Sequence, residues 1–220
     1  MEFIFIIIAF GALIGGIAYW GHLQEKKRQE ALASFAKEHD YDFVAGYDPS
    51  ILQKYQQFSL FRKGRGKRGK NSLKQTQEDS SIHIFDYRFT TGSGKNKSTH
   101  YHTCMYINGT QASFPHFFVR REIAVFDFLG KIFGGQDINF DSDPEFSDSF
   151  VLQGNDADKT RYFFSSQQKR SAFLIYKGTS ATIEGNGESL LITLSQQSPE
   201  KLSLEIDNAL LLYNSILPNA

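Results

Sequence analysis

The sequence predicts an α+β protein in which an N-terminal transmembrane helix is followed by a mainly antiparallel sheet packed with several helices. Three observations favour this class. An uncharged apolar run opens the chain from Phe3 to Trp20. The middle of the chain alternates apolar and polar residues between short turns, as antiparallel strands do. The last segment places apolar residues at helical spacing behind a Ser-Pro start signal.

The apolar run has the length and flanks of a membrane anchor. It is 18 residues long, and as a helix it spans about 27 Å, close to the roughly 30 Å hydrocarbon core of a bilayer. A cleaved signal peptide is the alternative, but it needs a basic stretch before the run and a small-x-small cleavage site after it. Here Glu2 is the only preceding charge, and Tyr19 and Trp20 form an aromatic exit. We therefore expect a retained anchor.

The residues after the anchor predict its orientation. Lys26, Lys27 and Arg28 follow the apolar run closely, and positive charge favours the cytoplasmic side. We expect the N-terminus outside and the C-terminal domain in the cytoplasm, in a bacterial inner membrane. The single cysteine agrees, because extracellular domains of this size often carry disulfides.

Glycines within the anchor indicate a way to pair two copies. Gly11 and Gly15 have the GxxxG spacing that lets two transmembrane helices approach closely. The alternative is that glycine is simply common in membrane helices. A homodimer through Gly11 and Gly15 is one hypothesis for the assembly.

The remaining chain divides into a juxtamembrane helix at 23–40 and a cytoplasmic α+β domain at 41–220, after the anchor at 1–22. The juxtamembrane helix would form a short stalk or pack on the domain. A strand is expected at 41–46, followed by an antiparallel meander of strands at 72–77, 82–90, 99–107 and 113–121. Further strands are expected at 136–140, 147–154 and on both sides of Asn186-Gly187. Helices are expected at 48–55, 123–133, 155–164, 167–176 and 198–216.

Charge is balanced overall but unevenly distributed. The chain has 24 Lys and Arg against 24 Asp and Glu. Residues 21–74 hold 12 cations and 6 acids by count, whereas residues 135–160 hold 7 acids and one lysine. This pattern indicates a basic face near the membrane and an acidic one elsewhere, or two solvated loops of opposite sign.

The most concentrated charge is the basic run RKGRGKRGK, residues 62–70. Its glycines predict a flexible, exposed loop that could bind anionic lipid or an acidic protein partner. A straight stalk over 21–39 would lift the domain by about 28 Å, beyond the Debye length of about 10 Å, so lipid contact would require the stalk to fold over. Nucleic acid is not favoured, because no RNP-like strand or recognition helix accompanies the run. The candidate binding residues are Arg62, Lys63, Arg65, Lys67 and Arg68.

No complete catalytic or metal motif is present. The loop TTGSGKNKST lacks the glycine and hydroxyl positions of a phosphate loop, and DINFDSDPEFSD lacks those of a calcium loop. His100, His102 and Cys104 alternate along one strand, but the outer two are about 13 Å apart, so one ion could take only two of them. His83 or Asp86 would have to complete such a site. We expect no metal and no cofactor.

Several phrases of the chain together resemble a known group of proteins. FSLFRKGRGKRGKNSL, FDYRFTTGSGKNKSTHYHT, FGGQDINFDSDPEFSDSFVLQG and YFFSS are similar to an uncharacterised family of bacterial single-pass membrane-anchored proteins with a cytoplasmic α+β domain. The similarity runs from about Leu32 onward. It implies architecture alone, since the family has no assigned activity. It also makes the hallmark FDYRFTTGSGKNKSTH a candidate interaction surface, with Asp86, Tyr87, Arg88, Thr91 and Lys95 as its residues.

Two functions remain. The first is a non-catalytic interaction or scaffold module at the cytoplasmic face of the membrane. The second is a membrane-bound, hydrolase-like enzyme using His100, His102, Asp86 or Arg88. The first is favoured, because the sequence offers no set of nucleophile, base and orienting group. A deep pocket where these side chains converge would support the enzyme, and an exposed hairpin would support the module.

Overall fold

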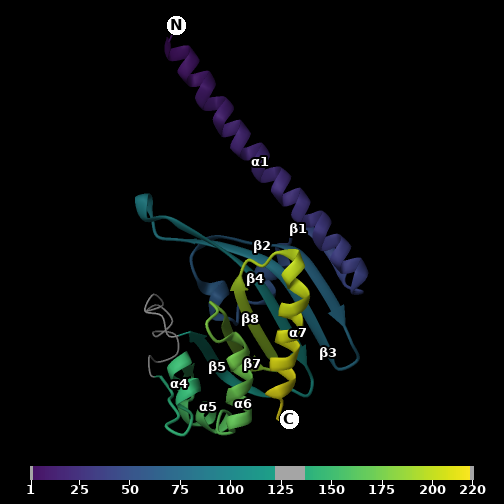
Figure 1. Ribbon diagram of the computed structural model, residues 1–220, viewed down its shortest axis with the longest axis vertical. Helices are drawn as coiled ribbons and strands as arrows, with labels where there is room; N and C mark the ends of the chain where they lie inside the picture. Colours follow the sequence, from purple (N-terminus) through teal and green to yellow (C-terminus); the bar gives the residue numbers. More distant parts are fainter. Residues whose placement is uncertain (1, 122–136, 219–220) are drawn as a thin grey trace.

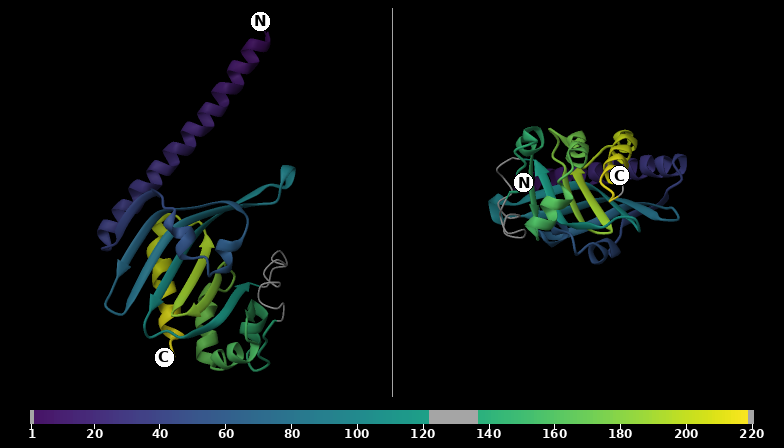
Figure 2. Two further views of the ribbon diagram at one scale, coloured as in Figure 1. Left: turned by 180° about the vertical axis from the view of Figure 1, so that it is seen from behind. Right: turned by 90° about the horizontal axis from the view of Figure 1, so that it is seen from below.

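The computed structural model describes residues 2–121 and 137–218; within the first helix, the side chains of residues 2–9, 11 and 12 lie outside the description. A twisted antiparallel sheet forms the body, helices cover it, and helix α1 (Glu2–Glu38) extends far beyond it (Figures 1 and 2). The strands are β1 (Asp42–Tyr47), β2 (Arg65–Thr76), β3 (Ser80–Thr91), β4 (Ser98–Gly109), β5 (Phe114–Arg121), β6 (Phe150–Gly154), β7 (Thr182–Gly187) and β8 (Ser189–Ser195). The other helices are α2 (Ser50–Lys54), α4 (Pro144–Ser149), α5 (Ala157–Phe163), α6 (Gln167–Ala172) and α7 (Pro199–Ser215), with 3-10 turns η1 (Ser59–Arg62), η2 (Gly94–Asn96) and η3 (Phe173–Tyr176).

The predicted α+β class with a mainly antiparallel sheet is confirmed, but the strand order differs from a simple meander. The eight described strands run β1-β2-β3-β4-β8-β7-β5-β6, all antiparallel. The β7–β8 hairpin lies between β4 and β5, which the sequence pattern had made neighbours. The five steps from Gly109 to Phe114 can cover about 16 Å, enough to cross three strand spacings of about 4.8 Å. A short connection therefore did not require adjacent strands.

One face of the sheet carries the larger apolar core. Helix α7 packs against this face through its buried side, which consists of Leu202, Ile206, Ala209 and Leu212. The C-terminal half of α1 joins the same core through Leu32 and Ala36. The helix predicted at 23–40 is thus a continuation of α1, and it packs on the domain instead of standing off as a stalk.

The opposite face carries a second core built around aromatic residues. Ile51 of α2, Tyr55 and Phe58 are fully buried against Phe85 of β3 and Cys104 of β4. Tyr55 stacks on Phe85, with ring centroids 5.2 Å apart and planes at 6°. The segment between β1 and β2 is therefore the cover of this face.

Two local predictions are corrected. The basic run was expected to be a loop, but β2 begins at Arg65 within it. Gly69 serves close packing there, because an added Cβ would meet Ile51 at 2.7 Å. The strand expected at 147–154 begins only at Phe150, because Pro144 opens α4, whose N-terminus is capped by Asp143 accepting from the Phe146 amide. The helix predicted at 123–133 lies outside the described residues.

Within the described residues, no helix is both long enough and apolar enough to cross a membrane. The predicted anchor starts at Phe3 and falls partly outside the described side chains, as does Gly11. The described apolar side chains of the N-terminal half of α1 are strongly exposed: Phe10, Leu13, Ile14, Ile17, Tyr19 and Trp20.

Candidate functional site

The joint between α1 and the sheet is built on an arginine and a buried aspartate. Arg28 of α1 donates from Nε to Asp86 Oδ2 at 2.7 Å and from Nη2 to Oδ1 at 2.6 Å. Its Nη1 donates to the Gln197 carbonyl at 2.7 Å, ahead of α7. This two-pronged geometry fixes direction as well as distance. Because Asp86 is only 2% exposed, α1 is held at a defined position over the middle of β3.

Further polar contacts from β2 complete this joint. Asn71 sits in an irregular stretch of β2 with φ 53°. Its Nδ2 donates to Asp86 Oδ2 at 3.0 Å and to Glu25 Oε1 at 2.8 Å, and its Oδ1 accepts from the Gly46 amide. Lys70 forms an ion pair with Glu25. Although burial opposes it, the contacts of Lys70 and Asn71 hold the pKa of Glu25 below its ordinary value. The "α1 joint" below means Glu25, Arg28, Lys70, Asn71 and Asp86.

The candidate residues of the hallmark segment separate by burial. Asp86 belongs to the α1 joint, and Tyr87, 1% exposed, faces the aromatic core on the other side of the sheet. Arg88 is half-buried, and Lys95 is exposed at the hairpin tip. The Thr91 hydroxyl forms a hydrogen bond with His100 Nε2 at 2.8 Å. Only the part from Arg88 onward therefore presents polar groups to an outside partner.

The candidate residues of the basic run divide in a similar way. Arg62 and Lys63 close the η1 segment, where burial lowers the pKa of Lys63 to about 8. Lys67 donates to the Phe61 carbonyl at 2.9 Å. Arg65 and Arg68 are exposed on β2. The fold thus uses part of this run internally and leaves Arg62, Arg65 and Arg68 exposed.

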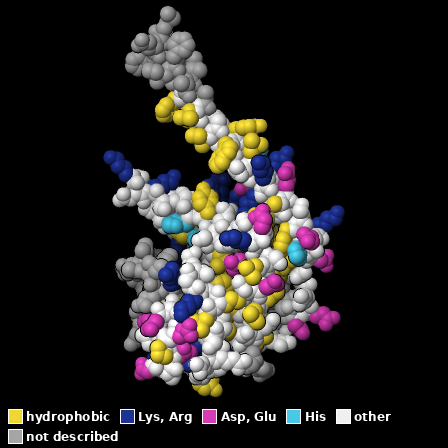
Figure 3. Space-filling model, viewed as in Figure 1, with side chains coloured by type: hydrophobic (Ala, Val, Ile, Leu, Met, Phe, Trp, Pro, Cys, Tyr) yellow, Lys and Arg dark blue, Asp and Glu magenta, His cyan; other side chains and the backbone are white. Residues whose placement is uncertain are grey.

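Five exposed or half-exposed cations collect at one end of the sheet. Arg68 lies directly opposite Arg88, and Arg65 opposite Thr90. Like charges placed across a strand pair repel each other, and among the described residues neither Arg68 nor Arg88 has an ion pair. Lys residues at the nearby β3–β4 tip add charge (Figure 3). The "basic end" below means Arg65, Arg68, Arg88, Lys95 and Lys97.

The basic end points the same way as the free part of α1. The β3–β4 hairpin extends well past its neighbours, and its tip leaves the body on the side toward which the N-terminal half of α1 projects (Figures 1 and 2). Tyr101, 48% exposed, lies opposite Arg88 on β4. An exposed aromatic among cations is typical of a surface that meets a membrane interface.

The residues considered for catalysis do not converge. Asp86 is opposite Thr103 and Tyr87 opposite His102, so Asp86 and Arg88 lie on one face of the sheet while His100, His102 and Cys104 lie on the other. Burial lowers the pKa of His102 to about 4 and raises that of the Cys104 thiol. His102 stacks at 5.6 Å from the ring of Phe89. In the described residues no group of three or more His, Cys, Asp or Glu could hold a metal ion.

Sequence reasoning missed three buried polar clusters. His83 lies between the hydroxyls of Tyr55 and Ser72. Glu184, 2% exposed, accepts from the Ser59 amide and hydroxyl and from His116 Nε2 at 2.8 Å. A buried ion pair joins Arg170 Nε to Asp143 Oδ2 at 2.8 Å. Each cluster joins segments distant in sequence, so no local motif marks them.

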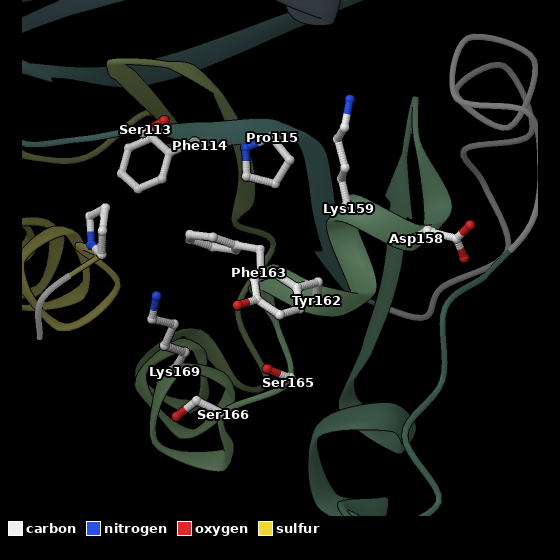
Figure 4. Close-up of a pocket in the computed structure, with 11 residues that line it drawn as sticks. Ser113, Phe114, Pro115, Asp158, Lys159, Tyr162, Phe163, Ser165, Ser166 and Lys169 are labelled. Carbon is white, nitrogen blue, oxygen red and sulfur yellow. The ribbon is translucent and has the colours of Figure 1, made fainter.

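A groove lies at the end of the domain away from the free part of α1. It is formed by the start of β5, by α5, by the α5–α6 loop and by α6, and has a volume of about 930 Å³ (Figure 4). Phe114, Pro115 and Phe163 form its apolar walls, and Lys159 and Lys169 are its cations.

The arrangement therefore defines a class: an α+β sheet domain fixed rigidly to a long N-terminal helix. A solved structure with this fold is the crystal structure of the mycobacterial trehalose monomycolate transport factor A, TtfA, with a TM-score of 0.58 and 10% sequence identity, covering 87% of this chain and 96% of that chain. At this identity the likeness shows the fold alone. No protein-family model and no curated protein sequence matches the chain.

Proposed function

We propose that this protein is a single-pass membrane-anchored interaction or scaffold module without catalytic activity, with its N-terminus outside and its α+β domain at the cytoplasmic face. The observation that carries the proposal is the α1 joint, because it makes one continuous helix both the apolar extension and a fixed part of the domain.

The exposed apolar side of α1 supports the anchor. Phe10, Ile17 and Trp20 are each 64% exposed, and such a surface on a single helix requires an apolar environment. The apolar run Phe3–Trp20 matches a bilayer in length, with Tyr19 and Trp20 at its interface.

The position of the joint supports a short distance between the domain and the proposed membrane. Arg28 lies seven residues after Gly21, which is about 10 Å along a helix. This is about one Debye length at physiological salt. The 28 Å separation expected for a free stalk does not apply, since the domain packs alongside α1 from Glu25 onward.

The basic end supports binding of anionic lipid headgroups as the second contact. Each cation that reaches an anionic surface adds about 1 kcal/mol, and phosphate groups between Arg68 and Arg88 would relieve their repulsion. An acidic protein partner is the competing occupant. The protein with the related fold is named as a transport factor, which is compatible with a non-catalytic role at a membrane.

Retention and orientation test the anchor directly. A C-terminal reporter that fluoresces only in the cytoplasm should be bright, and the protein should stay in the membrane fraction after a carbonate wash. Deleting residues 2–20 should release it. A reporter active only outside the cell, or full release of the intact chain by carbonate, would contradict the proposal.

Depth measurements in proteoliposomes test the lipid contact. Cys104 is fully buried, so a fluorophore on Ser93→Cys at the hairpin tip labels one site. Quencher-bearing lipids should quench it more in vesicles with phosphatidylglycerol than in phosphatidylcholine. The same label on Glu78→Cys, at the other end of β3, is the matched control.

Neutralising the basic end provides the decisive variant. Replacing Arg68, Arg88, Lys95 and Lys97 by glutamine should remove the difference between the two vesicle types, whereas Lys37→Gln should leave it. Equal quenching in both vesicle types for the wild-type protein, with an acidic protein captured through the same residues, would favour the competing occupant.

Pairing of anchors is proposed through Gly11 and Gly15. An added Cβ at Gly15 meets nothing within 4 Å in the single chain, so Gly15→Leu should leave the protomer unchanged. Cross-linking in membranes should give a dimer for the wild type and a monomer for this variant. A dimer that survives Gly15→Leu would place the contact elsewhere.

A further inference from the structure

The groove at the far end of the domain has rigid aromatic walls. Phe163 stacks on Phe117 at 5.7 Å and meets Phe114 edge-on at 5.8 Å. Arg170 fixes the adjacent loop, donating from Nη1 to the Phe164 and Ser165 carbonyls at 2.7 and 2.9 Å while pairing with Asp143. The walls are therefore held by the core and do not depend on a ligand.

One of its two cations has no counter-ion in the described part of the chain. Lys169 Nζ lies 4.5 Å from the centroid of the Phe163 ring, and partial burial lowers the pKa of this amine. Lys159 is different, because it pairs with Asp156 at 3.3 Å and is mostly exposed. In Figure 4 the Lys169 side chain and the Phe163 ring extend into the same space facing Phe114. An ammonium group placed over an apolar wall favours a ligand that is both anionic and apolar.

The strand beside the groove argues against an extended peptide. β5 is paired with β7 on one side and, from Phe117 onward, with β6 on the other. The stretch left open at the groove is short, and Pro115 within it has no amide hydrogen to donate to an added strand. A volume of about 930 Å³ falls within the usual range of about 300–1,000 Å³ for small-molecule sites.

We infer that this groove binds a single-chain anionic amphiphile, with its carboxylate on Lys169 and its hydrocarbon chain along Phe163, Phe114 and Pro115. Tyr162, 83% exposed at the rim, covers the outer side of the chain. This site is independent of the proposed tether, since it lies on different elements from the α1 joint and the basic end.

Titration of the full chain in lipid nanodiscs with sodium octanoate tests the site. Reductive ¹³C-methylation gives each lysine an NMR signal and keeps its charge; Lys169→Arg assigns the signal of Lys169. Octanoate should shift this signal saturably and raise the pKa of the amine. Octan-1-ol, which lacks the charge, and acetate, which lacks the chain, should each bind at least about tenfold more weakly.

Variants separate the charge from the wall. Lys169→Gln should weaken octanoate binding, followed by ligand-observed NMR, about tenfold, and Phe163→Leu should weaken it while keeping a side chain in the core. Lys37→Gln, on the far side, should bind as the wild type does. Equal binding of octanoate and octan-1-ol, equal binding of octanoate and acetate, or no saturable shift at Lys169 would each overturn the inference.

Discussion

At the scale of single residues, Arg28 determines where helix α1 meets the sheet domain. Its side chain is 16% exposed and that of Asp86 3%. Removing one partner of a buried pair costs about 3–5 kcal/mol, because the other charge stays in a poorly solvated place. The same residue also adds positive charge after the proposed anchor, so under the proposed topology one side chain would serve both orientation and packing.

Arg28→Ala should therefore lower the unfolding free energy by about 3 kcal/mol. In a chain of this size this corresponds to a fall in melting temperature of roughly 6–12 °C, measured by circular dichroism in nanodiscs. Lys26→Ala is the matched control on the same helix, since its ion pair with Glu30 is about two-thirds exposed and should matter little. Equal effects of the two changes would contradict the role of the α1 joint.

A second residue-scale prediction concerns acid sensitivity. Burial lowers the pKa of His83 to about 3, below its value of about 6.5 in an unfolded chain. Between these values the unfolded state binds the extra proton, so this contribution to stability is present above about pH 6.5 and is lost as the pH falls toward 3. The expected loss is up to about 1.4 kcal/mol per pH unit for this histidine.

Urea unfolding at several pH values measures this loss. His83→Asn should be less stable at neutral pH, since Tyr55 and Ser72 lose a partner, but it should show a shallower pH dependence between 6 and 4. An unchanged slope would mean that His83 is not the neutral buried group described. His102, whose pKa is lowered to about 4, should account for part of the remaining slope.

At the scale of elements, the β3–β4 hairpin depends on one glycine. Gly92 has φ +69°, and an added Cβ would meet the Asn96 carbonyl oxygen at 2.1 Å. Gly94 also has a positive φ, +55°, but an added Cβ there meets nothing within 4 Å. Alanine substitutions at Gly92 and Gly94 can therefore be compared to separate the cost of backbone strain from the cost of steric overlap.

Gly92→Ala should cost about 2–3 kcal/mol locally, and Gly94→Ala about 1 kcal/mol. Hydrogen exchange of amides near the tip should rise strongly in the first variant and little in the second. Because the tip carries Lys95 and Lys97, Gly92→Ala should also reduce the quenching difference between anionic and neutral vesicles. Identical behaviour of the two variants would mean that the turn is not fixed as described.

At the scale of the whole molecule, the proposed anchoring predicts that α1 sets the distance between the membrane and the sheet. Inserting seven alanines between Gly21 and His22 adds about two turns, lifting the domain by about 10 Å while nearly preserving the helix face. The charge-dependent quenching at Ser93→Cys should then fall to the level of the neutral vesicles. The melting temperature should not change, since the α1 joint is intact; an unaltered quenching difference would show that α1 does not act as a rigid spacer.

How far the sequence could predict this molecule depended on the range of the interactions involved. The hairpin at Asn186-Gly187 and the helix after Ser198-Pro199 were predicted correctly, because turn and cap chemistry act between near neighbours. The basic run was misjudged, because Gly69 permits close approach of Ile51 from α2, and that approach depends on a contact distant in sequence. The candidate site was located in part: the hallmark segment includes Asp86 and Arg88, but only pairing in the sheet separates their faces.

The sequence by itself determined the α+β class, the antiparallel hairpins and a long N-terminal helix, since periodicity, turns and caps are local properties of the chain. The tertiary structure alone decided that β7 and β8 separate β4 from β5, that Asp86 is buried beneath Arg28, and that two arginines face each other across β2 and β3. These features arise from pairing and burial between segments far apart in the chain. The pattern of charged and apolar residues indicates which groups need an interaction partner, and only the packed fold determines which residue that partner is.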